Sequence, residues 1–125
     1  MVRVDVAKTL TAAEDLAESF ADIIGDGLRS VILHGSLATG DFYPGRSDID
    51  ILVVIANSLT QTQVDALKDS VCHCDIGNAT GIDLHVITGE VGDRRTSAPP
   101  LELYIGRHDQ LSDVIEIERR VSGRQ

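Results

Sequence analysis

The chain has 125 residues, of which 42% are hydrophobic, so it is long enough for one domain with its own core, and we expect that domain to span residues 1–125. Its 20 acidic and 11 basic residues give a formal net charge of −9, which argues against a nucleic-acid-binding surface because such surfaces need clustered Lys and Arg. The N-terminus lacks an apolar export segment and the longest apolar run, 51–56, is too short to cross a bilayer, so we expect a cytoplasmic protein without a membrane partner.

The first expected elements are a helix and a strand. Thr11 and Glu14 form a capping-box pattern, and apolar residues then recur at every third or fourth position. Gly25 and Gly27 are expected to end this helix. The continuous apolar run within 28–34 fits a strand that is buried on both faces.

A turn, a second strand and a second long helix are expected next. Residues 36–39 can start a short helix, and the glycines and proline within 40–45 break the chain. The stretch 49–55 is rich in β-branched residues and reads as a strand. Thr60 and Gln63 form another capping-box pattern ahead of an apolar helical stripe.

The rest of the chain contains a third strand and a less regular tail. Residues 82–87 alternate between apolar and polar side chains, as a strand with one buried face does. Beyond them, 101–105 is a short apolar segment and 114–118 alternates imperfectly. The order of elements points to a sheet covered by helices.

Carboxylates fall on two of the expected strands. Asp48 and Asp50 lie two residues apart, so on a strand both project from the same face, and Asp83 belongs to the next strand. An unpaired carboxylate near a core is costly, and neighbouring strands would bring these side chains together at the edge of the sheet. Mg²⁺ prefers such oxygen ligands and fills its shell with water and phosphate oxygens. The sequence therefore predicts a magnesium site.

A glycine and a serine upstream suggest how a phosphate would be held. Gly35 lets the backbone approach a ligand closely, and Ser36 opens a short helix whose N–H groups and hydroxyl can bind a phosphate oxygen. The turn lacks the Lys of a P-loop, so we expect the metals, helped by Arg46, to compensate the phosphate charge. The alternative for Arg46 is an exposed cation in a turn.

These residues together resemble the polymerase-β-like nucleotidyltransferase superfamily. The motifs are His-Gly-Ser at 34–36, Ser-Asp-Ile-Asp at 47–50 ahead of an apolar strand, and Ile-Asp-Leu at 82–84. The wider sequences LHGS and RSDIDILVV, with PPLEL at 99–103, resemble the aminoglycoside adenylyltransferases that act on streptomycin and spectinomycin. The resemblance covers roughly residues 10–105.

The resemblance implies an α+β nucleotidyltransferase fold, in which helices cover a mixed sheet of three or more core strands. It also implies in-line attack of a substrate hydroxyl on the α-phosphate of ATP, the co-substrate, with release of pyrophosphate and with two Mg²⁺ ions bound. The acceptor would be a small cationic molecule such as an aminoglycoside, and the role antibiotic resistance. The residues carried over are Asp48, Asp50 and Asp83 for the metals and catalysis, and Gly35, Ser36, Arg46 and Ser47 for the nucleotide.

Two departures from that family leave alternatives open. The third acid is Asp83, where the streptomycin-type enzymes have Glu, so it would serve as a metal ligand or as the base. Those enzymes also continue into a C-terminal helical domain, which we expect to be absent here, and a homodimer or a separate helical partner is then expected to complete the site. The alternatives are a minimal nucleotidyltransferase that modifies a partner protein, as in toxin–antitoxin pairs, and a non-catalytic nucleotide-binding module.

Other chemically active residues receive structural interpretations. We expect His34 to be packed at the end of the first strand, because its neighbours are apolar. His85 shares a face with Asp83 and is either a plain strand residue or a minor part of the site. Cys72 and Cys74 lack the second ligand pair of a structural zinc site and are read as reduced cysteines in a loop.

Overall fold

The helices and strands follow one another along the chain in an order that fits an α+β domain. The computed structural model describes residues 2–35, 40, 43, 46–77, 79–89, 101–108 and 114–119. Its elements are α1 (Val2–Ile24), the 3-10 helix η1 (Gly25–Gly27), β1 (Leu28–His34), β2 (Ile49–Ile55), α3 (Gln61–His73), β3 (Gly81–Thr88), β4 (Leu101–His108) and β5 (Val114–Arg119).

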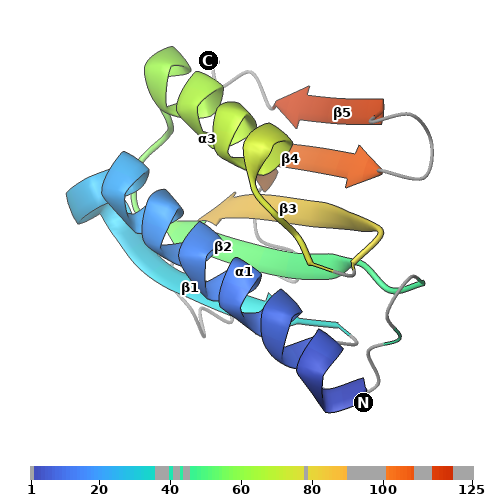
Figure 1. Ribbon diagram of the computed structural model, residues 1–125. Coiled ribbons are helices and arrows are strands. Elements are labelled where there is room, and N and C mark those ends of the chain that lie inside the picture. Colours follow the sequence, from blue (N-terminus) through green and yellow to red (C-terminus); the bar gives the residue numbers. More distant parts are fainter. Residues whose placement is uncertain are drawn as a thin grey trace.

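The strands form one sheet in the order β1-β2-β3-β4-β5. Strands β2 and β3 are parallel and the other neighbours are antiparallel, so the sheet is mixed, as the resemblance implied. A parallel pair needs a long crossover connection, and α3 provides it. Both α1 and α3 lie on one face of the sheet (Figure 1). Neither helix, among the residues described, is long and apolar enough to cross a bilayer.

The hydrophobic core lies between the two helices and the face of the sheet that they cover. Alternate residues of the central strands point into it, as the pleat of a strand requires. Burial of each large apolar side chain contributes about 1.5–3 kcal/mol to folding. The core includes Leu16, Phe20, Ile49, Ile51, Val53, Ile55, Leu67, Val71, Ile82, Leu84, Val86, Leu103 and Ile105.

The other face of the sheet, called here the opposite face, carries the remaining residues of each strand. No helix covers it within the described part of the chain (Figure 1). Most of its side chains are half-buried, and they include carboxylates, imidazoles and a phenol beside aliphatic groups. Its residues in β1 to β4 include Ser30, Ile32, His34, Asp50, Leu52, Val54, Asp83, His85, Ile87, Tyr104, Gly106 and His108.

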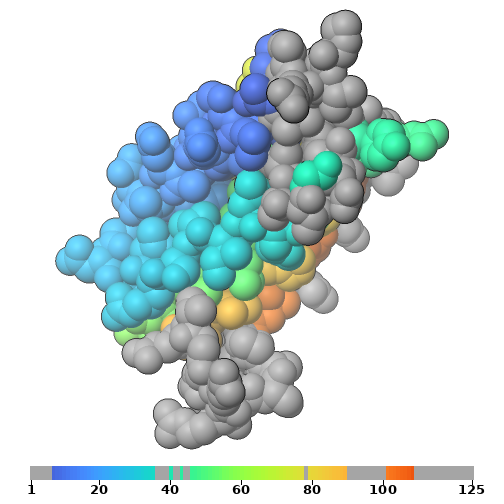
Figure 2. All heavy atoms as spheres, turned by 90° about the horizontal axis from the view of Figure 1, so that it is seen from below, coloured from blue at the N-terminus to red at the C-terminus, as the bar shows by residue number. Residues whose placement is uncertain are grey.

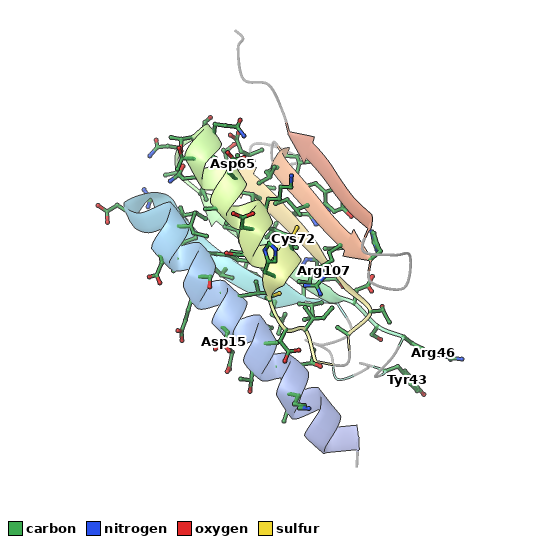
Figure 3. All side chains as sticks on the ribbon, turned by 45° about the horizontal axis from the view of Figure 1, so that its top comes forward. Asp15, Tyr43, Arg46, Asp65, Cys72 and Arg107 are labelled. Carbon is green, nitrogen blue, oxygen red and sulfur yellow. The ribbon has the colours of Figure 1, made fainter. Side chains whose placement is uncertain are left out.

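A cation from the sheet holds the end of α3. The Nη1 atom of Arg107 in β4 donates hydrogen bonds to the carbonyl oxygens of Val71, at 2.8 Å, and Cys74, at 2.9 Å. The last carbonyls of a helix have no partner within the helix and carry partial negative charge, so a guanidinium stabilises them. Figure 3 shows Arg107 beneath the last turn of α3.

Several elements expected from the sequence are confirmed. Strands β1 and β2 have the expected bounds, and β3 extends one residue further at each end. The two tail segments, for which no strand was predicted, are strands β4 and β5. The side chain of Thr60 accepts a hydrogen bond from the Gln63 N–H, and that of Gln63 accepts one from the Thr60 N–H, so the capping box of α3 is present.

Three expectations are wrong. Helix α1 begins at Val2, and Thr11 lies within it, where its hydroxyl donates to the Ala7 carbonyl at 3.1 Å instead of capping the helix. Strand β1 is an edge strand, so its residues are half-buried or exposed, and Figure 2 shows it uncovered beside α1. Cys72 belongs to the last turn of α3, not to a loop. The short helix expected at 36–39 lies outside the described residues.

Candidate active site

The register of the sheet brings the two strand carboxylates together. Asp50 pairs with Asp83 across the parallel strands β2 and β3. The two flanking strands extend this pairing: His34 of β1 pairs with Asp50, and Gly106 of β4 pairs with Asp83. Neighbouring strands lie about 5 Å apart, so these residues form a continuous row across the opposite face. Asp48 stands two residues before Asp50, just ahead of β2.

The row is crowded with negative charge. Burial raises the pKa of Asp50 above its ordinary value, and the adjacent charge of Asp83 raises it further. The nearby His34 lowers it, whereas Asp48 and a hydrogen bond with Asp83 add smaller upward contributions. Both burial and like charge disfavour an ionised carboxyl, so a cation bound here would stabilise the ionised form of Asp50.

Asp48 is held by the segment that leads into β3. The Thr80 hydroxyl donates to Asp48 Oδ1 at 2.5 Å, and the Thr80 N–H donates to the Ser47 carbonyl at 3.0 Å. Within the described residues, no group of three His, Cys, Asp or Glu side chains is already spaced to hold a metal ion. The structure therefore places Asp50 beside Asp83, with Asp48 close enough to act on Asp50 but bonded to a neighbouring hydroxyl.

Asp83 has a hydrogen-bond donor from the next strand. The Tyr104 hydroxyl donates to Asp83 Oδ1 at 2.7 Å. The Tyr104 ring also contacts the ring of His85, with 4.9 Å between the centroids, so His85 lies on the same face as the carboxylate.

Gly35 lies directly against the side chain of Asp50. Its φ is +77°, a conformation that side chains rarely adopt. A Cβ at this position would overlap the Asp50 carboxylate and lie 2.9 Å from its Cγ. The close backbone approach expected of Gly35 is therefore made to a carboxylate of the site.

A tight turn precedes Asp48. The N–H groups of Arg46 and Ser47 donate to the Tyr43 carbonyl at 3.0 and 2.9 Å, and the Ser47 Oγ accepts from the Tyr43 N–H at 2.9 Å. Arg46 and Tyr43 are exposed and project away from the sheet (Figure 3). The Ser47 hydroxyl shapes this turn and retains a proton to donate. Ser36, expected to bind phosphate, lies outside the described residues.

Sequence reasoning misplaced one residue and missed two. His34 is exposed opposite Asp50, not packed, because β1 is an edge strand. Thr80 and Tyr104 were not identified. Strand alternation in 101–108 is the signal for Tyr104, but it becomes useful only when that segment is recognised as the partner of β3.

A hollow of about 450 Å³ lies elsewhere, between α1 and the loop after α3. It is lined by Lys8, Thr11 and Asp15 from the helix and by Asp75 and Gly77 from the loop. None of the paired carboxylates contributes to it, so the acidic row remains the candidate site.

Comparisons with known proteins identify relatives of this fold. Residues 13–120 match the family described as a nucleotidyltransferase domain. Among solved structures, the chain is similar to the spectinomycin adenyltransferase AAD(9) from Enterococcus faecialis with ATP and spectinomycin, at 18% identity and a TM-score of 0.61. The match covers 88% of this chain and 48% of that one, so the chain spans about half the length of that protein, and at this identity the likeness shows the fold alone. No curated protein matches the sequence.

Proposed function

The chain belongs to the nucleotidyltransferase domain family, and from that premise we propose that it transfers AMP from ATP to a hydroxyl of a small cationic acceptor such as an aminoglycoside. The oxygen of the acceptor hydroxyl would form a bond to the α-phosphorus, pyrophosphate would leave with the cleaved P–O bond, and the hydroxyl proton would pass to solvent or a base. The observation that carries the proposal is the pairing of Asp50 with Asp83 on neighbouring parallel strands, with Asp48 beside them.

The residues at this site fit Mg²⁺. Magnesium is usually held by one or two protein carboxylates, with water and substrate phosphates completing its shell, so a preformed cage of three side chains is not required. Asp50 and Asp83 would form the centre of the site, and Asp48 would join it by exchanging its bond to Thr80. Bound Mg²⁺, in the two-ion arrangement, would stabilise charge on the attacking and leaving oxygens.

The nucleotide would lie along the end of the sheet where β1 stops and β2 begins. Gly35 would offer its backbone there, and Ser36 would contribute its N–H and hydroxyl to a phosphate oxygen. The Ser47 hydroxyl, which accepts a bond within its turn, still has a proton for a phosphate oxygen. Exposed Arg46 in the same turn would supply positive charge to the triphosphate.

Asp83 suits the role of a metal ligand better than that of a base. One of its oxygens already accepts the Tyr104 hydroxyl, and it pairs with Asp50, so its carboxylate is committed to interactions within the row. Asp is also one methylene shorter than the Glu of the streptomycin-type enzymes. We therefore propose that a group other than Asp83 accepts the proton of the acceptor hydroxyl.

A cationic acceptor is supported by charge. The formal net charge of −9 attracts cations to the molecule, and the acidic row lies on the opposite face. AAD(9), which shares the fold, was solved with ATP and spectinomycin. This chain spans about half the length of that protein. A second copy or a helical partner remains our proposal for further acceptor contacts.

The test uses ATP labelled at the α-phosphate, with Mg²⁺ and either spectinomycin or streptomycin. We expect label on the antibiotic and release of pyrophosphate by the wild type. Asp48→Asn should lower the rate by more than about 100-fold, because even partners of metal ligands typically cost 10- to 100-fold. Asp22→Asn, an exposed acid on α1, removes the same charge and should leave the rate unchanged.

The remaining arm of the experiment replaces the antibiotics with a cell lysate. Label on a protein band, and none on an antibiotic, would replace the small acceptor with a partner protein and keep nucleotidyl transfer. Equal turnover by the wild type and Asp48→Asn would refute the assigned site. No binding of Mg-ATP in calorimetry would refute the proposed function.

A further inference from the structure

Tyr104 occupies a defined place beside the acidic pair. It stands directly opposite His85 in the antiparallel β3–β4 register, and Asp83 is its diagonal neighbour. Its side chain leans along β4 so that the hydroxyl reaches Asp83 Oδ1 at 2.7 Å, the distance of a strong O–H···O⁻ hydrogen bond. The residue therefore connects β4 to a carboxylate of the proposed metal site.

Gly106 makes this conformation of Tyr104 possible. Gly106 lies two residues further along β4, on the same face, and pairs with Asp83. A Cβ at Gly106 would lie 2.9 Å from the Tyr104 Cζ, would overlap the hydroxyl oxygen, and would also lie 3.2 Å from the His108 Nε2. Any larger residue would thus push the phenol away from Asp83. Glycine is otherwise unfavourable in a strand, so a glycine that leaves room for a neighbouring ring has a specific role here.

His85 supports the ring from the other strand. The two ring centroids are 4.9 Å apart and the ring planes are inclined by 46°, within the range of a favourable aromatic pair. Directly opposed side chains on antiparallel strands stabilise each other in this way. With the imidazole on one side and Gly106 leaving space on the other, the phenol has a single well-defined position.

The carboxylate needs such a tether. The terminal torsion of an Asp side chain is broad, so the carboxylate plane of Asp83 is poorly fixed by its own rotamer. When Asp50 and Asp83 are both ionised, as cation binding requires, the two like charges repel each other. A hydrogen bond from a ring held by packing fixes the carboxylate plane.

Building on the proposed function, we propose that Tyr104 is a positioning residue: its hydroxyl fixes the Asp83 carboxylate in an orientation that binds a divalent cation together with Asp50, and Gly106 keeps the space that this requires. Residues that orient metal ligands typically change metal affinity or activity by 10- to 100-fold when they are replaced. Preorganisation of this kind keeps the ligand geometry ready before the metal arrives.

Metal binding can be measured without an acceptor. Mn²⁺ binding is followed by electron paramagnetic resonance of the free ion, and Mg-ATP binding by calorimetry. Tyr104→Phe retains the ring and its contact with His85 but removes the hydroxyl, and we expect its Kd for Mn²⁺ to rise about 10-fold. Gly106→Ala should have a similar effect by displacing the phenol. Because both changes act through the same hydrogen bond, the double variant should be no weaker than either single variant.

Thr60→Ala is the stability control. It removes the N-cap of α3, which lies past the end of β2 that is far from Asp50 and Asp83, and should cost about 1 kcal/mol of stability. The Mn²⁺ affinity of this variant should equal that of the wild type. If Tyr104→Phe binds Mn²⁺ as tightly as a wild type that binds it well, the positioning role is wrong and the proposed function stands. Additive effects in the double variant would mean that Gly106 does not act through Tyr104. A wild type that binds neither Mn²⁺ nor Mg-ATP would remove the proposed function and this inference together.

Discussion

The two faces of the sheet differ in what their side chains contact. On the helix-covered face, alternate residues of β2 and β3 are aliphatic and buried against α1 and α3. On the opposite face, the same strands carry Asp50, Asp83 and His85, which are only half-buried. The two carboxylates have hydrogen-bond partners, and the His85 ring contacts the ring of Tyr104. One strand therefore contributes to stability with one set of residues and to the proposed site with the set between them.

This separation explains how a short sheet can tolerate adjacent carboxylates. Repulsion between the adjacent carboxylates destabilises the fold. Packing on the other side of the same strands offsets it, since each buried side chain there contributes about 1.5–3 kcal/mol. Substitutions on the helix-covered face should therefore lower the free energy of unfolding and leave metal affinity unchanged. Substitutions on the opposite face should mainly change metal affinity.

The largest expected effect comes from the core. Leu67 on α3 is 0% exposed, and Leu67→Ala should lower the free energy of unfolding by about 3 kcal/mol, because it removes buried surface and leaves a cavity. Urea unfolding monitored by circular dichroism measures the change. Lys68→Ala, the exposed neighbour on the same helix, should stay within about 0.5 kcal/mol of the wild type. A large loss of Mn²⁺ affinity in the folded Leu67→Ala protein would contradict the separation of the two faces.

The bond between the sheet and α3 should have the next largest effect. Arg107→Met keeps the aliphatic stem but removes the donor to the Val71 and Cys74 carbonyls, and we expect a loss of about 2 kcal/mol. Arg29→Met is the matched control, since Arg29 is exposed on edge strand β1 and donates to the Asp26 carbonyl at 3.2 Å. Equal unfolding midpoints for the two variants would show that the Arg107 bonds contribute nothing.

A substitution at Gly35 should change both the stability of the fold and the affinity for metal. Gly35→Ala should cost about 1 kcal/mol, because alanine disfavours a positive φ, and should weaken Mn²⁺ binding because the new methyl displaces Asp50. Gly25→Ala has a similar φ of +72° but nothing within 4 Å of the added Cβ. It should show the same loss of stability with unchanged Mn²⁺ affinity. Matching losses of affinity would exclude the displacement of Asp50 as the cause.

The sequence predicted the elements whose signals are local. The β-branched run of β2 and the Thr60–Gln63 capping box are formed by neighbouring residues, and the structure has both. The predicted start of α1 was wrong because the Thr11–Glu14 pattern also fits the interior of a helix, where the Thr11 hydroxyl donates to a preceding carbonyl.

Non-local features could not be predicted in the same way. That β1 is an edge strand depends on the order of the whole sheet, and the exposure of His34 follows from it. The spacing of Asp48 and Asp50 indicated a cation site, but the pairing of Asp50 with Asp83 depends on the register between strands separated by α3. Tyr104 belongs to a further strand, so its bond to Asp83 required the complete sheet.

The smallest expected effect on stability is a gain. Because the pKa of Asp50 is raised in the folded protein by burial and by Asp83, ionised Asp50 destabilises the fold above that raised pKa. The penalty disappears below the ordinary pKa of Asp, about 4, where both states carry the proton. Asp50→Asn should therefore unfold at a higher temperature than the wild type near neutral pH in chelator, and this advantage should vanish as the pH falls through that window.

Calorimetric scans with and without Mg²⁺ separate charge repulsion at the site from a general effect of net charge. Asp22→Asn, an exposed acid on α1, provides the correction for net charge. Excess Mg²⁺ should stabilise the wild type and leave Asp50→Asn nearly unchanged, since a ligand stabilises only the protein that binds it. If Asp50→Asn were less stable than the wild type in chelator, Asp50 would be a structural residue of the opposite face. If it is more stable but cannot bind Mn²⁺, the fold retains this carboxylate at a cost, for the cation that it holds.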